Sequence, residues 1–216
     1  FNHCHFVTST THKTLRGPRG GVIMMAKDGE NTLGLKDVKG NLRLWSNVID
    51  MAVFPGTQGG PLEHVMAAKA VAFFEILQPE FRAYTEQMLK NTKAMEAAFL
   101  DKGYHIVSGG SDNHLLLLDL RNKNISGKKA ENTLVKADIT LNKNMVPFDD
   151  KSPFITSGIR VGVPAITTRG LKEAHMPLVV NWLDKVLMDP DNESNIEKVR
   201  KEVNEFMLQF ALYPEM

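Results

Sequence analysis

The second half of the chain alternates short apolar runs with segments of helical period, and this alternation constrains the fold most. Runs with the composition of strands occur at Tyr104–Val107, Leu115–Leu120 and Gly158–Val163. Helical character is found in residues 127–137, 171–187 and in a last segment that ends near Leu212. The spacing from Ser194 to Glu197 is that of a capping box at the start of this last helix. We therefore predict an α+β module with a small sheet.

The first part of the chain predicts two strands followed by helices. Residues 5–11 are rich in β-branched side chains, and Val22–Met25 predicts a second, buried strand. From Pro61, apolar residues recur at spacings of three and four, with Pro61 suited to the first helical turn. A second helix is expected from about Glu80 to Lys102. We place a domain boundary near residue 75, which gives domains 1–75 and 76–216.

Charge and cysteine content exclude several classes of protein. Twenty-six Lys and Arg against 25 Asp and Glu give a net charge of +1, which disfavours nucleic-acid binding through bulk electrostatics. No apolar run approaches the roughly 18 residues of a membrane span. One cysteine, Cys4, allows no internal disulfide and fits a reducing, cytoplasmic compartment. The chain begins with Phe1 and has no signal-peptide pattern, so we expect that its natural beginning is missing.

A basic, glycine-rich segment after the first predicted strand is the first candidate for chemistry. Lys13 lies beside His12, Arg16 and Arg19. Neighbouring positive charge favours the neutral form of a lysine amine, which can then act as a Schiff-base nucleophile. The glycines allow the backbone to come close to a ligand. From spacing alone, a solvated basic loop or a simple anion site remains open.

Two further segments are candidates for anion binding. Gly56–Pro61 precedes a predicted helix, whose N-terminal N–H groups and dipole favour phosphate, although glycines also serve tight turns. Arg160 lies in an apolar, strand-like context, where its planar guanidinium can bind a carboxylate through two parallel hydrogen bonds. A structural pair of Arg160 with Asp or Glu is the alternative.

The sequence His3-Cys4-His5 does not predict a metal site, because Cys4 would face away from both histidines on a strand.

Three long segments carry a resemblance to a known family, and they occur in that family's order. TSTTHKTLRGPRGG at residues 8–21 resembles the cofactor-lysine signature of serine hydroxymethyltransferase. VFPGTQGGP at residues 53–61 resembles its second glycine-rich segment, and KSPFITSGIRVG at residues 151–162 resembles its substrate-arginine segment. The resemblance covers essentially the whole chain and corresponds to the C-terminal half of a full family member.

This resemblance implies an α/β fold: part of the large domain of a fold-type I (aspartate aminotransferase-like) enzyme that uses pyridoxal 5'-phosphate, followed by its smaller α+β domain. The family interconverts serine plus tetrahydrofolate with glycine plus 5,10-methylenetetrahydrofolate. Lys13 is implied to hold the cofactor as an internal aldimine. The other implied roles are phosphate contact by His12, a lining position for Arg19, and binding of the substrate carboxylate by Arg160.

The resemblance also implies partners. Gly59 and Gly60 would present backbone N–H groups to the phosphate bound in the other subunit of a homodimer with shared active sites, and a tetramer is also compatible with the family. Asn144 matches a position that contacts the pterin of folate. The acid that pairs with the pyridine nitrogen lies upstream in the family. We therefore expect the 216 residues alone to be catalytically insufficient.

Alternative functions stay open at this point. Another fold-type I enzyme, such as a threonine aldolase or an aminotransferase, also uses a lysine and a carboxylate-binding arginine. A non-catalytic fragment is the alternative from a different class, either one that serves only dimerisation or one whose basic loop, with Arg16 and Arg19, binds RNA or a protein. The long lysine segment and Asn144 favour the hydroxymethyltransferase.

Overall fold

The structure is a computed structural model, which describes residues 3–212. The chain divides into two compact units, Phe1–Phe81 and Arg82–Met216. Each unit is described by itself. The assignment of domains 1–75 and 76–216 stays a prediction.

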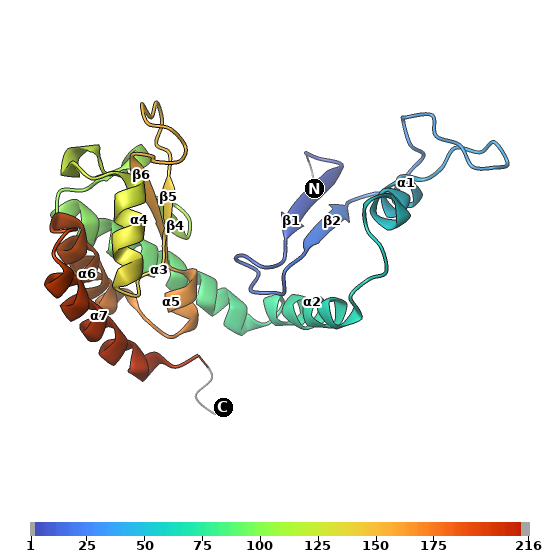
Figure 1. The fold of residues 1–216 in the computed structure, drawn as a ribbon. Coiled ribbons are helices and arrows are strands. Elements are labelled where there is room, and N and C mark those ends of the chain that lie inside the picture. Colours follow the sequence, from blue (N-terminus) through green and yellow to red (C-terminus); the bar gives the residue numbers. More distant parts are fainter. Residues whose placement is uncertain (1–2, 213–216) are drawn as a thin grey trace. The chain divides into compact units, whose positions relative to one another are not determined.

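The first unit is built on a β-hairpin. Strands β1 (Phe6–Thr10) and β2 (Gly21–Met25) pair antiparallel, with Phe6 opposite Met25 and Thr10 opposite Gly21 (Figure 1). The connection between them, residues 11–20, is the basic segment that contains Lys13. The two strands were therefore predicted correctly, and their pairing places the lysine in the hairpin loop.

Two helices follow the hairpin in the first unit. Helix α1 is Trp45–Met51, and helix α2 is Glu63–Ile76. Between them, residues 52–57 form a wide turn that is closed by a hydrogen bond from the Gln58 N–H to the Val53 oxygen, at 2.7 Å.

Two expectations about this unit were wrong. Strand β2 is not buried: Ile23 is 44% exposed and Met24 is 37% exposed, because β1 is the only strand paired with it among residues 3–212. Pro61 does not lie in the first turn of α2. The helix begins at Glu63 after Leu62, whose oxygen accepts the first hydrogen bonds, from Val65 and Met66.

The second unit contains an antiparallel sheet in the order β3-β4-β6-β5. Its strands are β3 (His105–Ile106), β4 (Leu115–Asp119), β5 (Asn142–Asn144) and β6 (Gly158–Gly162). Leu117 lies opposite Arg160 on one side of β6, and Asn142 lies opposite Arg160 on the other. Opposite residues in an antiparallel pair share a face of the sheet, so the register fixes which side chains lie together.

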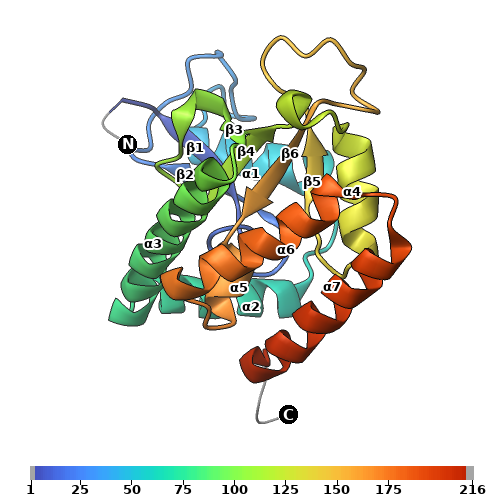
Figure 2. The ribbon, with the colours of Figure 1, turned by 90° about the vertical axis from the view of Figure 1, so that its left-hand side faces the viewer.

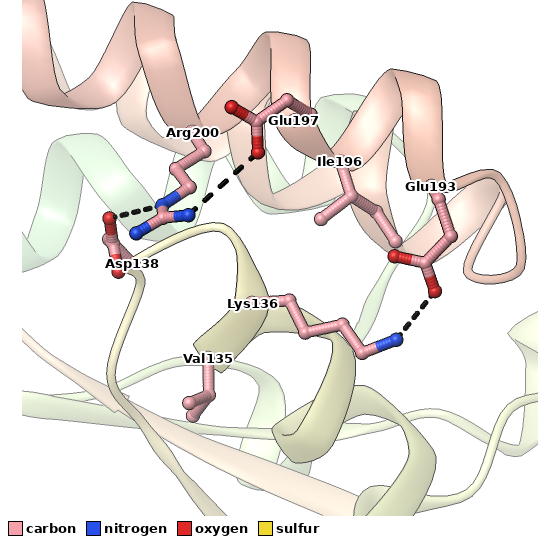
Figure 3. A pocket seen from close by; sticks show the side chains of 7 residues that line it. All are labelled: Val135, Lys136, Asp138, Glu193, Ile196, Glu197 and Arg200. Carbon is pink, nitrogen blue, oxygen red and sulfur yellow. Dashed lines mark hydrogen bonds and ion pairs between the residues drawn. The ribbon is translucent and has the colours of Figure 1, made fainter.

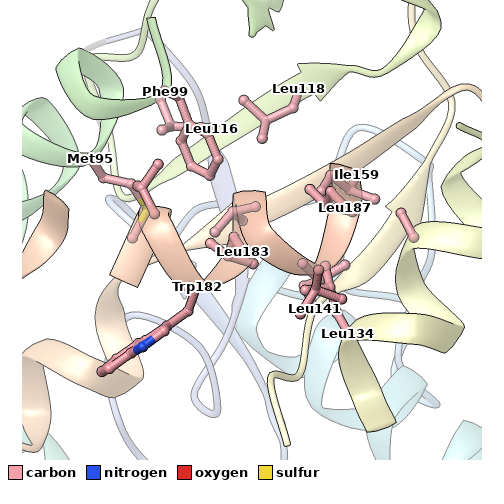
Figure 4. Packing of buried hydrophobic residues seen from close by; sticks show 14 of the residues in the cluster. Met95, Phe99, Leu116, Leu118, Leu134, Leu141, Ile159, Trp182, Leu183 and Leu187 are labelled. Atoms are coloured by element: carbon pink, nitrogen blue, oxygen red, sulfur yellow. The ribbon is translucent and has the colours of Figure 1, made fainter. Parts of the chain in front are cut away.

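Helices cover one face of this sheet, which we call the core face. They are α3 (Pro79–Asp101), α4 (Gly127–Lys136), α5 (Pro164–Thr168), α6 (Met176–Met188) and α7 (Glu193–Met207) (Figure 2). Leu118 and Ile159 from the sheet pack with Phe99, Leu183 and Leu187 from the helices (Figure 4). All five are at most 2% exposed, so apolar burial on this face holds the unit together.

Several elements of this unit differ from the expectation. Strand β5 and helix α5 were not predicted. The helix expected at 171–187 begins at Met176, after a short turn at Glu173–His175. The cap of α7 is Asn192, whose side chain accepts the Asn195 N–H at 3.0 Å, so the capping box at Ser194 was wrong. Asn192 is an equally good cap and lies where the chain enters the helix.

Within residues 3–212, no helix combines the length and apolarity that a membrane crossing requires.

Candidate functional site

The hairpin loop holds Lys13 on a backbone that is closed by hydrogen bonds. Thr11, which is fully buried, lies at its centre: its N–H donates to the Gly20 oxygen at 3.0 Å, and its hydroxyl donates to the Pro18 oxygen at 2.7 Å. The Gly17 N–H donates to the Thr11 oxygen at 2.7 Å. Two residues further on, the side chain of Lys13 is exposed. The loop therefore presents an accessible primary amine on a backbone that its own hydrogen bonds close.

The other basic residues of this loop differ in their surroundings. Nδ1 of His12 lies 3.3 Å from both the N and the O of Gly20, so its tautomer decides whether it accepts or donates there. Either arrangement leaves Nε2 available. Arg16 has a left-handed backbone (φ 56°), and its guanidinium lies 5.5 Å from the centre of the Phe81 ring. Arg19 is exposed.

Gly59 and Gly60 are exposed and lie just before α2, outside its first turn. A Cβ atom on either glycine would meet nothing within 4 Å. The surrounding space therefore does not require glycine at these positions. What they offer is an open stretch of backbone that another molecule can approach.

Arg160 and Asn144 share one face of the four-stranded sheet. Asn144 lies opposite Gly158, and Asn142 lies opposite Arg160, so Asn144 is the diagonal neighbour of Arg160. This face is opposite to the core face, and we call it the open face. The structure thus brings together two predicted site residues from segments that the sequence treated separately.

Arg160 has no structural partner among residues 3–212. It is exposed and makes no ion pair with a carboxylate of that part of the chain. Arg169, nine positions further on, behaves differently: its guanidinium donates to the oxygens of Phe210 at 2.8 Å and Met207 at 3.0 Å, at the end of α7. Of these two arginines, Arg160 is the one that remains able to bind an external anion.

Charged groups around the open face shape its electrostatics. The pKa of His114 lies below its usual 6.5, first because the ring is partly buried and second because Arg160 is near. At the other end of β4, hydrogen bonds from Arg121 lower the pKa of Asp119, with Nη2 of Arg121 2.6 Å from Oδ2 of Asp119. The charge of Asp119 is thus compensated locally, and no carboxylate of residues 3–212 forms an ion pair with Arg160 on this face.

Two cavities of the second unit are lined by residues other than Arg160 and Asn144. One, of about 300 Å³, lies between α4 and α7, and its charged groups pair with one another: Lys136 with Glu193 at 2.5 Å, and Arg200 with Asp138 at 2.7 Å (Figure 3). Another, of about 580 Å³, is lined by residues 107–113 together with Leu115 and Leu117 of the open face, and by Lys93 and Glu96 of α3.

Sequence reasoning missed two residues that support the candidate site. Thr11 entered only as part of the lysine motif, and Asp149, whose carboxylate accepts the backbone N–H and the hydroxyl of Ser157, was not considered. A threonine directly before a basic glycine-rich loop is a signal that could have been followed, because its hydroxyl often bonds nearby backbone. His3, Cys4 and His5 are exposed, and residues 3–212 contain no cluster of three or more His, Cys, Asp or Glu arranged to hold a metal ion.

The fold points to a class of protein. A mixed α/β chain agrees with a fold-type I enzyme that uses pyridoxal phosphate, and within residues 3–212 it presents an exposed lysine on a closed hairpin loop and an arginine without an ion pair on an open sheet face. The model of one family, described as serine hydroxymethyltransferase, matches residues 1–183. The match covers well over half of the chain, and the chain belongs to the serine hydroxymethyltransferase family. The resemblance inferred from the three segments is confirmed.

Proposed function

We propose that this chain supplies the cofactor lysine and the substrate arginine of a glycine hydroxymethyltransferase. The reaction is the reversible transfer of a one-carbon unit between serine and tetrahydrofolate, which gives glycine and 5,10-methylenetetrahydrofolate. The observation that carries the proposal is the lysine loop, in which buried Thr11 closes the backbone and Lys13 remains exposed. The family match supports the same reading.

The residues of the first unit fit pyridoxal phosphate by their chemistry. Lys13 offers an amine for covalent attachment, and His12 has one ring nitrogen that the loop leaves available for a phosphate oxygen. Arg19 adds a positive charge that is not neutralised by an ion pair within residues 3–212. When bound, the cofactor supplies the electron sink for bond cleavage at the substrate α-carbon, and the protein supplies orientation and charge.

The open face supplies the groups that orient the substrates. Arg160 binds the amino-acid carboxylate through its planar fork, which fixes the direction of the bonds at the α-carbon. Asn144, its diagonal neighbour, contacts the pterin of tetrahydrofolate. Gly59 and Gly60 offer backbone N–H groups to the phosphate of the partner subunit in a homodimer. We keep the cytoplasmic location and the low affinity for nucleic acid as part of this proposal.

Absorbance spectroscopy tests the central assignment. We expect the purified chain to give a visible band when pyridoxal phosphate is added. Lys13→Ala removes that band, whereas Lys27→Ala, which replaces another exposed lysine of the first unit, keeps it. Reduction with borohydride followed by peptide mapping then locates the cofactor. A cofactor found on a different side chain contradicts the proposal.

A second experiment separates Arg160 from a merely structural arginine. In a protein with full activity, Arg160→Lys is expected to raise KM for serine about tenfold or more, because lysine cannot form the bidentate contact. Since Arg160 is exposed and unpaired within residues 3–212, the variant should unfold at the same denaturant concentration as the wild type. An unchanged KM rules out the carboxylate role.

Folate dependence separates the proposed activity from its alternatives. A threonine aldolase or an aminotransferase acts without tetrahydrofolate, whereas serine cleavage by a hydroxymethyltransferase is strongly increased by it. A non-catalytic RNA-binding fragment would instead show a salt-dependent shift of RNA with a slope of several units. In a protein with full activity we expect tetrahydrofolate to stimulate serine cleavage, and for the 216-residue chain we expect no such RNA shift.

A further inference from the structure

Lys69 of α2 lies against the end of the hairpin loop that carries Lys13. We propose that Lys69 is a positioning residue for Lys13, which it controls through Gly20 and Gly21. The inference rests on the proposed function, because it takes Lys13 as the cofactor lysine. The sequence gives no signal for this role beyond a lysine within a helical period.

The first contact is between the Lys69 side chain and the backbone at the start of β2. Nζ of Lys69 donates a hydrogen bond to the Gly21 oxygen at 3.1 Å. A Cβ atom on Gly20 would lie 2.6 Å from both Cε and Nζ of Lys69. The end of the lysine side chain therefore passes directly across Gly20, and it can do so because Gly20 has no side chain.

Gly20 connects this contact to the lysine loop. Its oxygen accepts the Thr11 N–H at 3.0 Å and the Thr11 hydroxyl at 3.2 Å. Both its N and its O lie 3.3 Å from Nδ1 of His12. Thr11 and His12 immediately precede Lys13, so a displacement of Gly20 changes the backbone from which the Lys13 side chain extends.

A second contact with the loop comes from the same face of the helix. Ala72 is one helical step of three residues from Lys69 and is buried. Its Cβ would lie 3.1 Å from a Cβ on Gly17, whose N–H donates to the Thr11 oxygen at 2.7 Å. Helix α2 thus meets the loop at two points, and both lead to Thr11. The apolar contact is fixed by packing, whereas the Lys69 contact depends on one hydrogen bond that a single substitution removes.

The experiment uses the 216-residue chain and four single substitutions. Lys69→Met removes the donor and keeps an unbranched side chain that is one atom shorter. Lys69→Arg restores a donor, and Lys27→Met is the matched control on an exposed lysine. Gly20→Ala leaves Lys69 in the sequence but takes the space that its side chain occupies. Two readouts are measured: amide hydrogen exchange at Thr11 and Gly17, and the rate at which borohydride fixes pyridoxal phosphate on Lys13 as a function of pH.

We expect Lys69→Met to increase exchange at Thr11 and Gly17 about fivefold and to slow fixation at Lys13 by a similar factor, with a shifted pH midpoint. Lys69→Arg recovers most of both losses, and Lys27→Met changes neither. Gly20→Ala reproduces the effect of Lys69→Met, and the double variant is no worse than either single variant, because both break the same contact.

The outcomes separate this inference from the proposed function. If Lys13 of the wild type takes up no pyridoxal phosphate, the proposed function fails and the inference falls with it. If the wild type is modified at Lys13 and Lys69→Met reacts at the same rate with the same pH midpoint, only the positioning role is overturned. Faster exchange without a change in fixation also overturns it, since Lys69 then serves the fold and not the reactive amine.

Discussion

Asp149 accepts two hydrogen bonds from Ser157, one from its backbone N–H at 2.8 Å and one from its hydroxyl at 2.7 Å. The same carboxylate accepts the N–H groups of Lys151 at 3.0 Å and Val146 at 3.2 Å. These bonds close the connection from β5 to β6, the two strands that carry Asn144 and Arg160. One side chain thus holds the loop that sets the relation between the two predicted substrate contacts.

Stability at acid pH should depend on Asp149. Burial opposes its charged form, but the hydrogen bonds from Lys151, Ser157 and Val146 together outweigh burial and lower its pKa far below 3.8. Since the pKa is lower in the folded state, the stabilisation is complete above about pH 4 and is lost as the pH falls below that value. We expect Asp149→Asn to lose about 1–3 kcal/mol of unfolding free energy at neutral pH. Urea titrations at several pH values should show that the variant loses less unfolding free energy between pH 4 and pH 2 than the wild type does. An equal dependence of unfolding free energy on pH in the two proteins would contradict this role.

The start of α4 leaves no room for a side chain at Gly127. A Cβ atom there would lie 2.1 Å from the Thr156 hydroxyl and 2.3 Å from the Gly158 oxygen. Because Gly158 begins β6, Gly127→Ala should displace the strand that carries Arg160 and cost about 1–3 kcal/mol or more. Circular dichroism during urea unfolding measures this cost. Gly29→Ala, where a Cβ meets nothing within 4 Å, should unfold close to the wild type.

A buried amide ties α3 to the segment that follows β6. The Nδ2 group of Asn91, which is fully buried, donates to the Thr167 hydroxyl at 2.8 Å and to the Leu171 oxygen at 2.9 Å. Asn91→Ala leaves these acceptors without a donor and should lower the unfolding free energy by about 1–3 kcal/mol. Asn132→Ala, on an exposed position of α4, should be neutral or slightly stabilising, because alanine favours helix more than asparagine does. Equal losses in the two variants would refute the importance of the buried bonds.

Two phenylalanines of the second unit should differ sharply in their contribution to stability. Phe99 is fully buried and packs edge-to-face on Tyr104, with ring centres 5.2 Å apart. Phe99→Ala is expected to cost about 3–5 kcal/mol in a thermal or urea unfolding experiment. Phe148 is 99% exposed, and Phe148→Ala should change the unfolding free energy by less than about 0.5 kcal/mol.

How far the sequence predicts this fold depends on whether the signal is local. The period of α3 and the apolar run of β4 were sufficient to predict both elements. Strand β5 consists of Asn142, Lys143 and Asn144, so its sequence has no apolar alternation. These residues form a strand because they pair with β6. The apolar residues of β2 predicted burial, which requires packed layers on both sides that a two-stranded hairpin does not provide.

The candidate site shows the same division. Lys13 and Arg160 could be selected from the sequence, because each lies in a short segment with nearby glycines that is itself the signal. Lys13 was selected as a nucleophilic amine and Arg160 as a planar guanidinium. The sequence left open whether Arg160 pairs with a carboxylate. In the structure Arg160 lies exposed on the open face and makes no ion pair within residues 3–212. The neighbourhood of Arg160 and Asn144 depends on strand register, and the contact of Lys69 with Gly21 joins residues 48 positions apart. Neither can be inferred without the tertiary structure.

The alternation of side chains along β6 separates recognition from folding within five residues. Ile159 and Val161 anchor the strand in the hydrophobic interior, and Arg160 between them points to the opposite side. A substitution of Arg160 could therefore change which ligand binds without disturbing the packing of the strand. The deletion of a single residue upstream would reverse the sides, expelling the aliphatic pair into water and forcing the guanidinium inward, so function and stability would disappear in one event.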